Sequence, residues 1–144
     1  MSRHEDCIFC KIIEGEIPSA KVYEDEDVYA FLDISQVTKG HTLVIPKKHV
    51  KNIYETDAET AEKLFARVPR IAEGIKQAFN PNGMNVLNNN EEAAGQTVFH
   101  LHLHLIPRYG KEDGFGAKWN ANAEAYSQDD LKNISSAING KITT

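Results

Sequence analysis

The stretch HLHLHLIP, residues 100–107, places a histidine at every second position and a leucine after each of them. Successive side chains of a β-strand point to opposite faces of the sheet, so this alternation predicts a strand over residues 100–107. The leucines form a core face, while the three histidines follow one another at intervals of about 7 Å on the other face. A helix would scatter the histidines around its axis. The histidine face therefore carries chemistry, with metal binding, acid–base catalysis and nucleophilic attack all open.

The length and charge of the whole chain limit the class of protein. Its 144 residues favour a single domain over residues 1–144, and its formal net charge at pH 7 is −5. There is no basic stretch, so we expect no long nucleic acid as a partner. The start MSRHEDCIFCK carries charges where a signal peptide needs an apolar run, and no stretch approaches the roughly 18 apolar residues of a membrane span. We therefore expect a cytoplasmic protein with no membrane partner.

Further strands are predicted around the histidine stretch. Residues 21–34 read as a hairpin around an acidic turn at 24–27, and residues 41–49 form another strand that ends at a proline and two lysines. A fourth strand follows at residues 84–88. Near the start of the chain, residues 7–13 form a short helix or turn. These short strands, joined by turns, are typical of an antiparallel sheet.

One long helix is predicted between the third and fourth strands. Apolar residues recur at helical spacing from residue 61 to 79, Thr56 and Glu59 fit a capping box at its start, and Pro69 should kink it. A second, shorter helix is expected from a Ser127 cap to Gly140. The fold class is therefore α+β, with an antiparallel sheet and one long helix packed on it.

Four blocks of sequence resemble one known family, and they occur in that family's order. They are FLDI (31–34), GHTLVIPKKH (40–49), the asparagine-rich strand end at 88–90, and AGQTVFHLHLHL (94–105). The chain resembles the histidine triad family of nucleotide hydrolases and transferases over a core of residues 7–109, and residues 110–144 form a C-terminal tail. The resemblance implies a small α+β domain that dimerises and hydrolyses a nucleoside monophosphate from a phosphate or amine leaving group.

The histidines suit nucleophilic catalysis. A neutral imidazole is a nucleophile near pH 7, and neighbouring hydrogen-bond donors neutralise charge on phosphoryl oxygens. By resemblance, His102 is the nucleophile that becomes nucleotidylated, and His104 on the same face contacts the phosphate. His41 corresponds to a fourth histidine behind the nucleophile, although by itself it is equally consistent with a buried strand histidine.

The resemblance also implies a purine nucleotide site. Asp33 accepts hydrogen bonds from both ribose hydroxyls, a role compatible with that of a turn residue at a strand end. The phosphate loop is formed by Gly95, Gln96 and Thr97, whose amide and hydroxyl groups donate, and Asn89 lies near the same phosphate. The apolar positions of the base pocket are Phe9, Ile12, Ile17 and Ile34, which without the resemblance are simply expected in the core.

A possible metal site comes from Cys7-x-x-Cys10. Alone, the pair leaves free thiols, redox chemistry and metal binding open. With His49 and His100 it makes two thiolates and two imidazoles, a tetrahedral set suited to structural zinc. The set is similar to that of the zinc-bearing family members, which implies one structural zinc per subunit. His100 must then face the metal rather than the nucleotide.

These features predict a nucleotide-binding hydrolase that acts in two displacements, with AMP as the released nucleotide. The substrate is a phosphoramidate or a dinucleoside polyphosphate. Where the family's phosphoramidase branch commonly has a glycine pair, this chain has Ile106, Pro107, Arg108 and Tyr109. In this stretch it looks closer to the branch of the family that splits dinucleoside polyphosphates. The alternative from another class is a nucleotide sensor or adaptor that turns over slowly.

A symmetric homodimer is also expected, built around the long helix and an adjacent edge strand. The apolar stripe of the long helix is wide for an amphipathic helix, and one sheet face of a chain this small would not cover all of it. Pairing of two chains would also cover an exposed strand edge. The tail around Trp119 would reach the partner's active site and help set the leaving-group pocket. The alternative is that Trp119 caps its own core.

Overall fold

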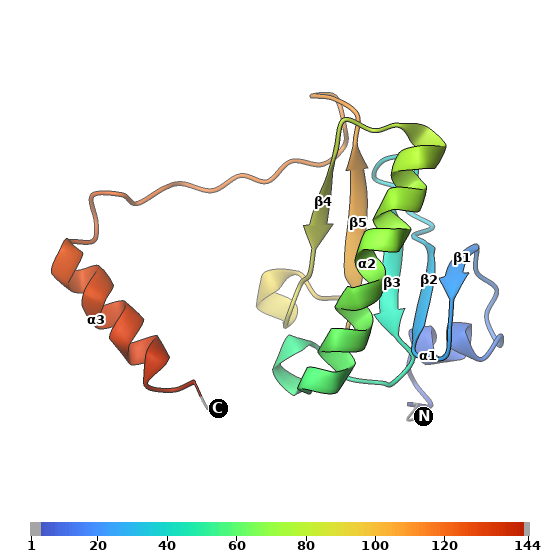
Figure 1. Ribbon diagram of the computed structural model, residues 1–144, viewed down its shortest axis with the longest axis horizontal. Coiled ribbons are helices and arrows are strands. Elements are labelled where there is room, and N and C mark those ends of the chain that lie inside the picture. The colour runs from blue at the N-terminus through green and yellow to red at the C-terminus, as the bar shows by residue number, and fades with distance from the viewer. Residues whose placement is uncertain (1–3, 143–144) are drawn as a thin grey trace.

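The computed structural model describes residues 4–142 and contains one five-stranded antiparallel sheet (Figure 1). The strands lie in the order β1-β2-β3-β5-β4. Their bounds are Lys21–Glu24 (β1), Val28–Leu32 (β2), Thr42–Pro46 (β3), Gly83–Leu87 (β4) and Leu103–Arg108 (β5). Helix α2 (Ala58–Phe79) packs on one face of the sheet, and the short helix α1 (Ile8–Ile13) lies at the other. The predicted α+β fold class is confirmed.

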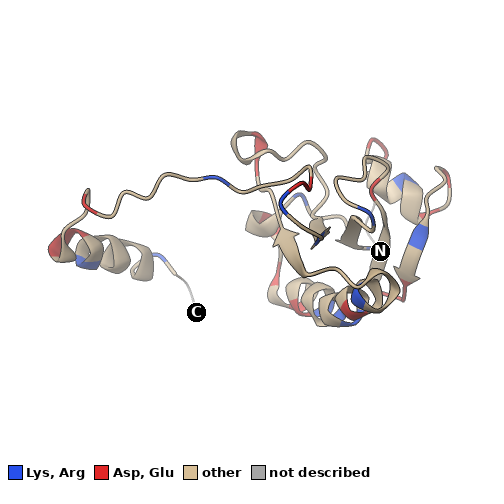
Figure 2. Cartoon of the chain, turned by 90° about the horizontal axis from the view of Figure 1, so that it is seen from above, with Lys and Arg blue, Asp and Glu red and all other residues tan. Residues whose placement is uncertain are grey.

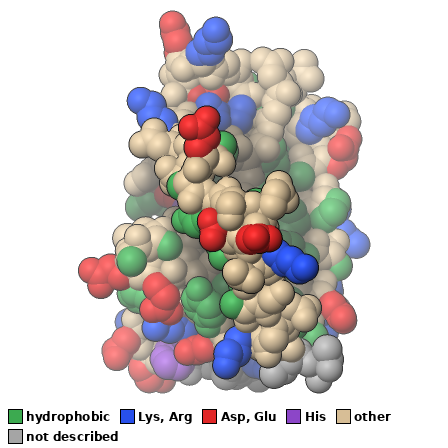
Figure 3. Space-filling model, turned by 90° about the vertical axis from the view of Figure 1, so that its left-hand side faces the viewer, with side chains coloured by type: hydrophobic (Ala, Val, Ile, Leu, Met, Phe, Trp, Pro, Cys, Tyr) green, Lys and Arg blue, Asp and Glu red, His purple; other side chains and the backbone are tan. Residues whose placement is uncertain are grey.

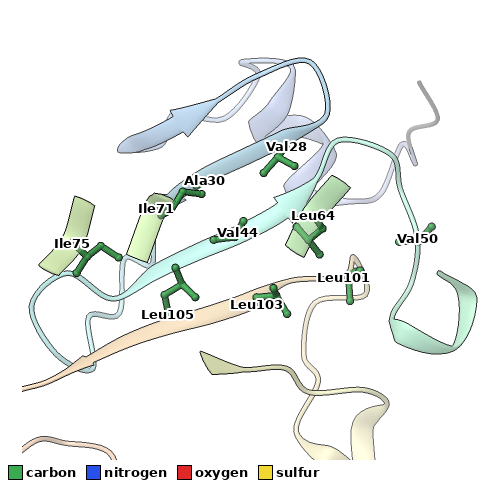
Figure 4. Close-up of a cluster of buried hydrophobic side chains, with 10 residues drawn as sticks. All are labelled: Val28, Ala30, Val44, Val50, Leu64, Ile71, Ile75, Leu101, Leu103 and Leu105. Atoms are coloured by element: carbon green, nitrogen blue, oxygen red, sulfur yellow. The ribbon is translucent and has the colours of Figure 1, made fainter. Parts of the chain in front are cut away.

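Side chains that alternate along the central strands divide the core into two layers. Leu101, Leu103 and Leu105 pack with residues of β2 and β3 beneath Leu64 and Ile71 of α2 (Figure 4). The second layer contains the opposite faces of β2 and β3, where Phe31 and Leu43 meet Phe9 of α1. The three histidines face this second layer, as the alternation predicts.

The predicted hairpin at residues 21–34 is present, and its acidic turn is tied to the long helix. Asp25 Oδ1 accepts hydrogen bonds from the backbone N–H groups of Asp27 and Val28, at 2.8 and 2.9 Å. Its Oδ2 accepts from Arg67 Nε of α2 at 2.8 Å. The turn therefore fixes β1 and β2 against α2.

Helix α2 begins at a different cap from the one expected. Its N-cap is Asp57, whose side chain accepts from the Thr60 N–H, whereas the Thr56 hydroxyl donates to the carbonyl of Asn52 in the preceding 3₁₀ helix (Ile53–Glu55). The capping box on Thr56 was wrong, because adjacent Thr and Asp both cap well and the preceding turn engages the threonine. The helix continues through Pro69.

The histidine strand begins three residues later than expected, at Leu103. Opposite it, β3 ends at Pro46, which has no N–H to continue the ladder. The Pro46 carbonyl instead accepts from His100 Nε2 at 2.8 Å, and the Leu101 N–H donates to the carbonyl of Val50. His100 and His102 thus lie on irregular backbone, which allows their rings to reach separate sites.

Residues 110–142 form a C-terminal arm, and its helix α3 (Gln128–Asn139) stands away from the rest of the chain (Figure 1). Its helix begins at the predicted Ser127 cap, where Ser127 and Asp130 form a complete capping box, and its C-cap is Gly140. Trp119 is 81% exposed, so it does not cap its own core. None of the described helices is long and apolar enough to cross a membrane.

Candidate functional site

A pocket of about 450 Å³ opens between α1, the end of β2 and the histidine strand. Ten of its lining residues are apolar, which gives an apolar interior with a few convergent polar groups, as is usual for small-molecule sites. The lining includes both His102 and His104 together with the predicted ligand residues Phe9, Ile12, Ile17, Asp33, Ile34, Asn89, Gly95 and Thr97. It also includes residues that the sequence did not single out, among them Ile8, Phe31, Leu43 and Val98.

Hydrogen bonding sets the tautomer of His102. Its Nδ1 lies 2.7 Å from the backbone carbonyl oxygen of His100, which can only accept. Nδ1 therefore carries the proton, and Nε2 keeps a free lone pair. The Asn88 side chain donates to the carbonyl of His102 at 3.0 Å, and the Phe9 ring packs edge-on against the imidazole. The backbone and the ring of His102 are thus both held.

A second chain of hydrogen bonds sets the tautomer of His104. The Val37 N–H donates to His41 Nδ1 at 3.3 Å, so His41 carries its proton on Nε2. That nitrogen lies 2.9 Å from His104 Nδ1, which accepts, and the His104 proton is left on Nε2. His104 is therefore a donor beside the lone pair of His102, with the two ring centroids 5.1 Å apart. His41 lies against His104, not behind His102 as expected.

Burial keeps these imidazoles neutral. It lowers the pKa of His102 below the ordinary value, although the hydrogen bond to the His100 carbonyl and the charge of Asp33 raise it. Burial, followed by repulsion from His102 and His41, lowers the pKa of His104 to about 4. Burial also lowers the pKa of His41. At neutral pH the pocket thus offers one unprotonated nitrogen next to one neutral N–H donor.

Asp33 has the position expected of a turn residue and also faces the pocket. Its Oδ1 accepts from the Ser35 N–H at 2.8 Å, and its Oδ2 lies 3.6 Å from His41 Nε2. Gln36, which the sequence did not single out, closes this loop by donating to the carbonyls of Asp33 and His41. The carboxylate is therefore held at the pocket rim.

The predicted phosphate loop has one member that differs from the expectation. Gln96 is buried, its Nε2 donates to the carbonyls of Lys51 and Val98, and its Oε1 accepts from Asn52 Nδ2 and the Glu91 N–H. Both amide hydrogens are therefore used within the protein, and the side chain holds the loop in place rather than presenting a donor to the pocket. No sequence signal could have shown this, because Lys51 and Asn52, two of its four partners, lie more than 40 residues away in the chain.

Gly95 and Thr97 line the pocket on either side of Gln96. Gly95 has φ +94°, a left-handed conformation that favours glycine and ends the 3₁₀ helix Glu92–Ala94. Among the apolar positions, Phe9 and Ile12 also belong to the core, whereas Ile34 is fully exposed at the pocket mouth. Phe9 and Ile12 thus lie both in the core and in the wall of the pocket.

The thiol–imidazole cluster comprises Cys7, Cys10, His49 and His100, whose ligand atoms all lie within 4.8 Å of one another. The Sγ atom of Cys10 is 3.4 Å from His49 Nδ1 and 3.7 Å from His100 Nδ1. Tetrahedral zinc with Zn–S of about 2.3 Å and Zn–N of about 2.0 Å needs such pairs roughly 3.5 Å apart. The donor set and its spacing therefore fit a metal ion, and zinc chemistry in particular.

Groups outside the cluster orient its ligands. His100 Nε2 donates to the Pro46 carbonyl, which leaves the Nδ1 lone pair facing the two thiols, and burial lowers the pKa of His100 to about 4. Cys7 caps α1 by accepting from the Cys10 N–H. His4, which the sequence did not single out, stacks on His49 with ring centroids 3.9 Å apart.

A family model described as the HIT domain matches residues 14–111. "Protein hit" of Bacillus subtilis is 66% identical over 134 residues, which cover 93% of this chain and 92% of that protein. The chain therefore belongs to the HIT, or histidine triad, family. Cys7 and Cys10 lie before the matched range.

Several relatives have names that state an activity. Adenosine 5'-monophosphoramidase hnt1 of Schizosaccharomyces pombe is 38% identical over 94% of this chain and 98% of that protein. Adenylylsulfatase HINT3 of Arabidopsis thaliana is 44% identical over 72% of this chain, but this covers only 52% of the plant protein.

Solved structures match along nearly the whole chain. The crystal structure of a HIT family member from Bacillus subtilis has a TM-score of 0.95 at 63% identity and covers 97% of this chain and 99% of its own. A Streptococcus mutans structure has a TM-score of 0.93 at 51% identity, covering 98% of this chain and 88% of its own.

Proposed function

We propose that this chain hydrolyses AMP phosphoramidates through a covalent nucleotidyl intermediate on His102. The observation that carries this is the pair of opposite tautomers, with the His102 Nε2 lone pair next to the His104 Nε2–H in a buried pocket. The names of the fission yeast and plant relatives, each of which acts on an adenylyl compound, support the same class of reaction.

The reaction has two displacements at the α-phosphorus. His102 Nε2 attacks, the bond from phosphorus to the leaving group breaks, and the leaving group takes up a proton from solvent. The carbonyl of His100 meanwhile stabilises the positive charge that develops on the imidazole through its bond to Nδ1–H. Water then attacks phosphorus, the bond from phosphorus to His102 Nε2 breaks, AMP leaves, and the proton that the water loses returns to solvent. His104 donates to a phosphoryl oxygen in both steps.

We assign nucleotide contacts by position in the pocket. Asp33 accepts the ribose hydroxyls, Asn89, Gly95 and Thr97 surround the phosphate, and the apolar wall takes a purine. His41 is a positioning residue that acts through His104. Gln96 positions the phosphate loop.

A phosphoramidate is favoured over a dinucleoside polyphosphate because the residues that suggested the latter serve elsewhere. Ile106 is buried, and Arg108 donates to Asn85, Asp113 and the Phe115 carbonyl. Within the described chain, the pocket lining does not include residues 106–109.

A panel of substrates tests the proposed function. Purified protein is assayed with adenosine 5'-phosphoramidate, an AMP-lysine conjugate, a dinucleoside polyphosphate and adenosine 5'-phosphosulfate, with AMP binding measured alongside. We expect the highest kcat/KM for the two phosphoramidates. AMP binding without turnover of any substrate would indicate a sensor instead, and preference for the dinucleotide would overturn the substrate assignment.

We further propose that the thiol–imidazole cluster holds one structural zinc per subunit. Its support is the donor set, and its place beside the pocket: His100 offers Nδ1 to the cluster while its carbonyl holds His102. Zinc there would stabilise the fold around residue 100 and take no part in bond breaking.

We also propose a symmetric homodimer through α2 and the edge strand β4. Phe65 of α2 and Val86 of β4 are both half exposed, and β4 has a neighbour on one side only among the described strands. Joining two β4 edges would pair the open ladder and bury these side chains. Light scattering at micromolar concentration should give the mass of two chains.

A further inference from the structure

The apolar face of α3 is uncovered. Leu131, Ile134 and Ile138 recur at i, i+3 and i+7, and each is at least 43% exposed. No residue of this helix is buried. An isolated helix of 12 residues is marginally stable in water, so α3 needs a surface against which to pack.

The arm leaves the body of the chain in a fixed direction. Arg108 donates to the Asp113 carboxylate and to the Phe115 carbonyl, while the Tyr109 hydroxyl donates to the Lys39 carbonyl at 2.7 Å. From there the arm runs past the β4 edge, and α3 stands clear of the body on that side (Figure 1). Figure 3, seen from this side, shows hydrophobic side chains at the surface.

The direction of the arm is shared with solved relatives. Residues 110–144 are about a quarter of the chain, so TM-scores of 0.95 and 0.93 over nearly its whole length require the arms to superpose as well. An arm held only by the packing of one crystal would not recur in proteins from two genera. This recurrence favours a holding surface within an assembly that these proteins share over a contact of a single crystal.

A groove that suits the apolar face of a helix lies between β1 and α2. Its volume is about 610 Å³, and most of its lining is apolar, including Val22, Ile71, Ile75 and Phe79. It lies on the opposite side of α2 from β4, so the proposed dimer leaves it open. Lys39 and Arg70 line it, and no carboxylate does so within the described residues.

The charges of helix and groove are complementary. The first turn of α3 carries Asp129 and Asp130, seen as the acidic end of the isolated helix in Figure 2. We propose that α3 of one chain docks into the β1–α2 groove of a second copy, so that the two chains exchange arms. The apolar stripe packs against α2 and β1 of the partner, and the acidic turn faces its two cations. The inference rests on the proposed homodimer, not on the proposed reaction.

Photo-crosslinking in the full-length protein tests this exchange. One variant carries p-benzoylphenylalanine in place of Leu131, and a second carries it in place of Phe79 in the groove. We expect both to give a covalent band of two-chain mass, with peptides from residues 126–142 joined to peptides from residues 21–32 or 66–80. The matched control replaces Ser136, on the polar face of α3, and should crosslink far less.

The outcomes separate this inference from the other proposals. Crosslinks within one chain would mean that the arm folds back on its own groove, and a dimer without groove crosslinks would mean that α3 docks elsewhere; either overturns the inference. A monomer mass by light scattering would overturn the dimer with it. Phosphoramidate turnover, measured on the same samples, decides the proposed function separately.

Discussion

The thiol–imidazole cluster and the pocket are adjacent, and both use histidines from one short stretch, yet they are built for opposite purposes. In the cluster, His100 turns its lone pair toward two thiols because its Nε2–H is held by the Pro46 carbonyl. In the pocket, His102 turns its lone pair toward open space because its Nδ1–H is held by the His100 carbonyl. In both cases the other ring nitrogen donates to a backbone carbonyl, so the choice of donating nitrogen decides where the lone pair points: toward the thiols for His100 and toward the pocket for His102.

The largest effect should follow from removing the nucleophile. His102→Asn should lower kcat by at least about 10³-fold, while AMP affinity and thermal stability change little. The reason is that His104, the other histidine lining the pocket in the described chain, has its unprotonated Nδ1 engaged by His41. Stopped assays, calorimetric AMP titration and thermal melts measure the three. Turnover within threefold of wild type would remove His102 from its role.

Removing the thiols of the cluster should instead lower the stability of the protein. A Cys7→Ser, Cys10→Ser double variant should lose its zinc and about 4 kcal/mol or more of unfolding free energy, because the ligands that join α1 to residues 49 and 100 are gone. Elemental analysis and urea unfolding test this on protein never exposed to chelator. Wild-type protein without zinc would contradict the metal assignment.

The ribose contact should have an intermediate effect. An ionised Asp33 accepting two hydroxyls should favour AMP over dAMP by roughly 1.5–3 kcal/mol, the scale of hydrogen bonds to a charged group. Asp33→Asn should narrow this difference, whereas Asp25→Asn, outside the pocket, should leave it unchanged. Equal affinity of the wild type for AMP and dAMP would exclude Asp33 from the site.

The smallest effect concerns pH. His102 acts only when its Nε2 is unprotonated, and burial lowers its pKa below the ordinary 6.5. Its unprotonated fraction is therefore largest above that lowered value and is lost as pH falls through it. An ordinary pKa of 6.5 would make single-turnover rates drop roughly 1.8-fold between pH 7.5 and 6.5, so the lowered pKa predicts a smaller drop. A drop of roughly 1.8-fold or more would mean an ordinary or raised pKa.

Sequence alone predicted that the leucines and histidines of residues 100–107 lie on opposite faces, because the period of a strand is a local property of the chain. It also grouped Cys7, Cys10, His49 and His100, which the structure brings together. It could not give the tautomers, which depend on carbonyls and N–H groups such as those of Pro46 and Val37 from other strands and loops. It also did not predict that the Gln96 side chain bonds within the protein, because Lys51 and Asn52, two of its partners, lie in another loop.

Trapping the covalent intermediate tests the central claim most directly. Wild-type protein is mixed with adenosine 5'-phosphoramidate, quenched with base within milliseconds, digested and analysed by mass spectrometry, with His102→Asn as the control. The account predicts AMP attached to the peptide that contains His102, at Nε2, and no adduct in the control. Rapid turnover with no adduct at any quench time, or with AMP on His104 instead, would contradict it.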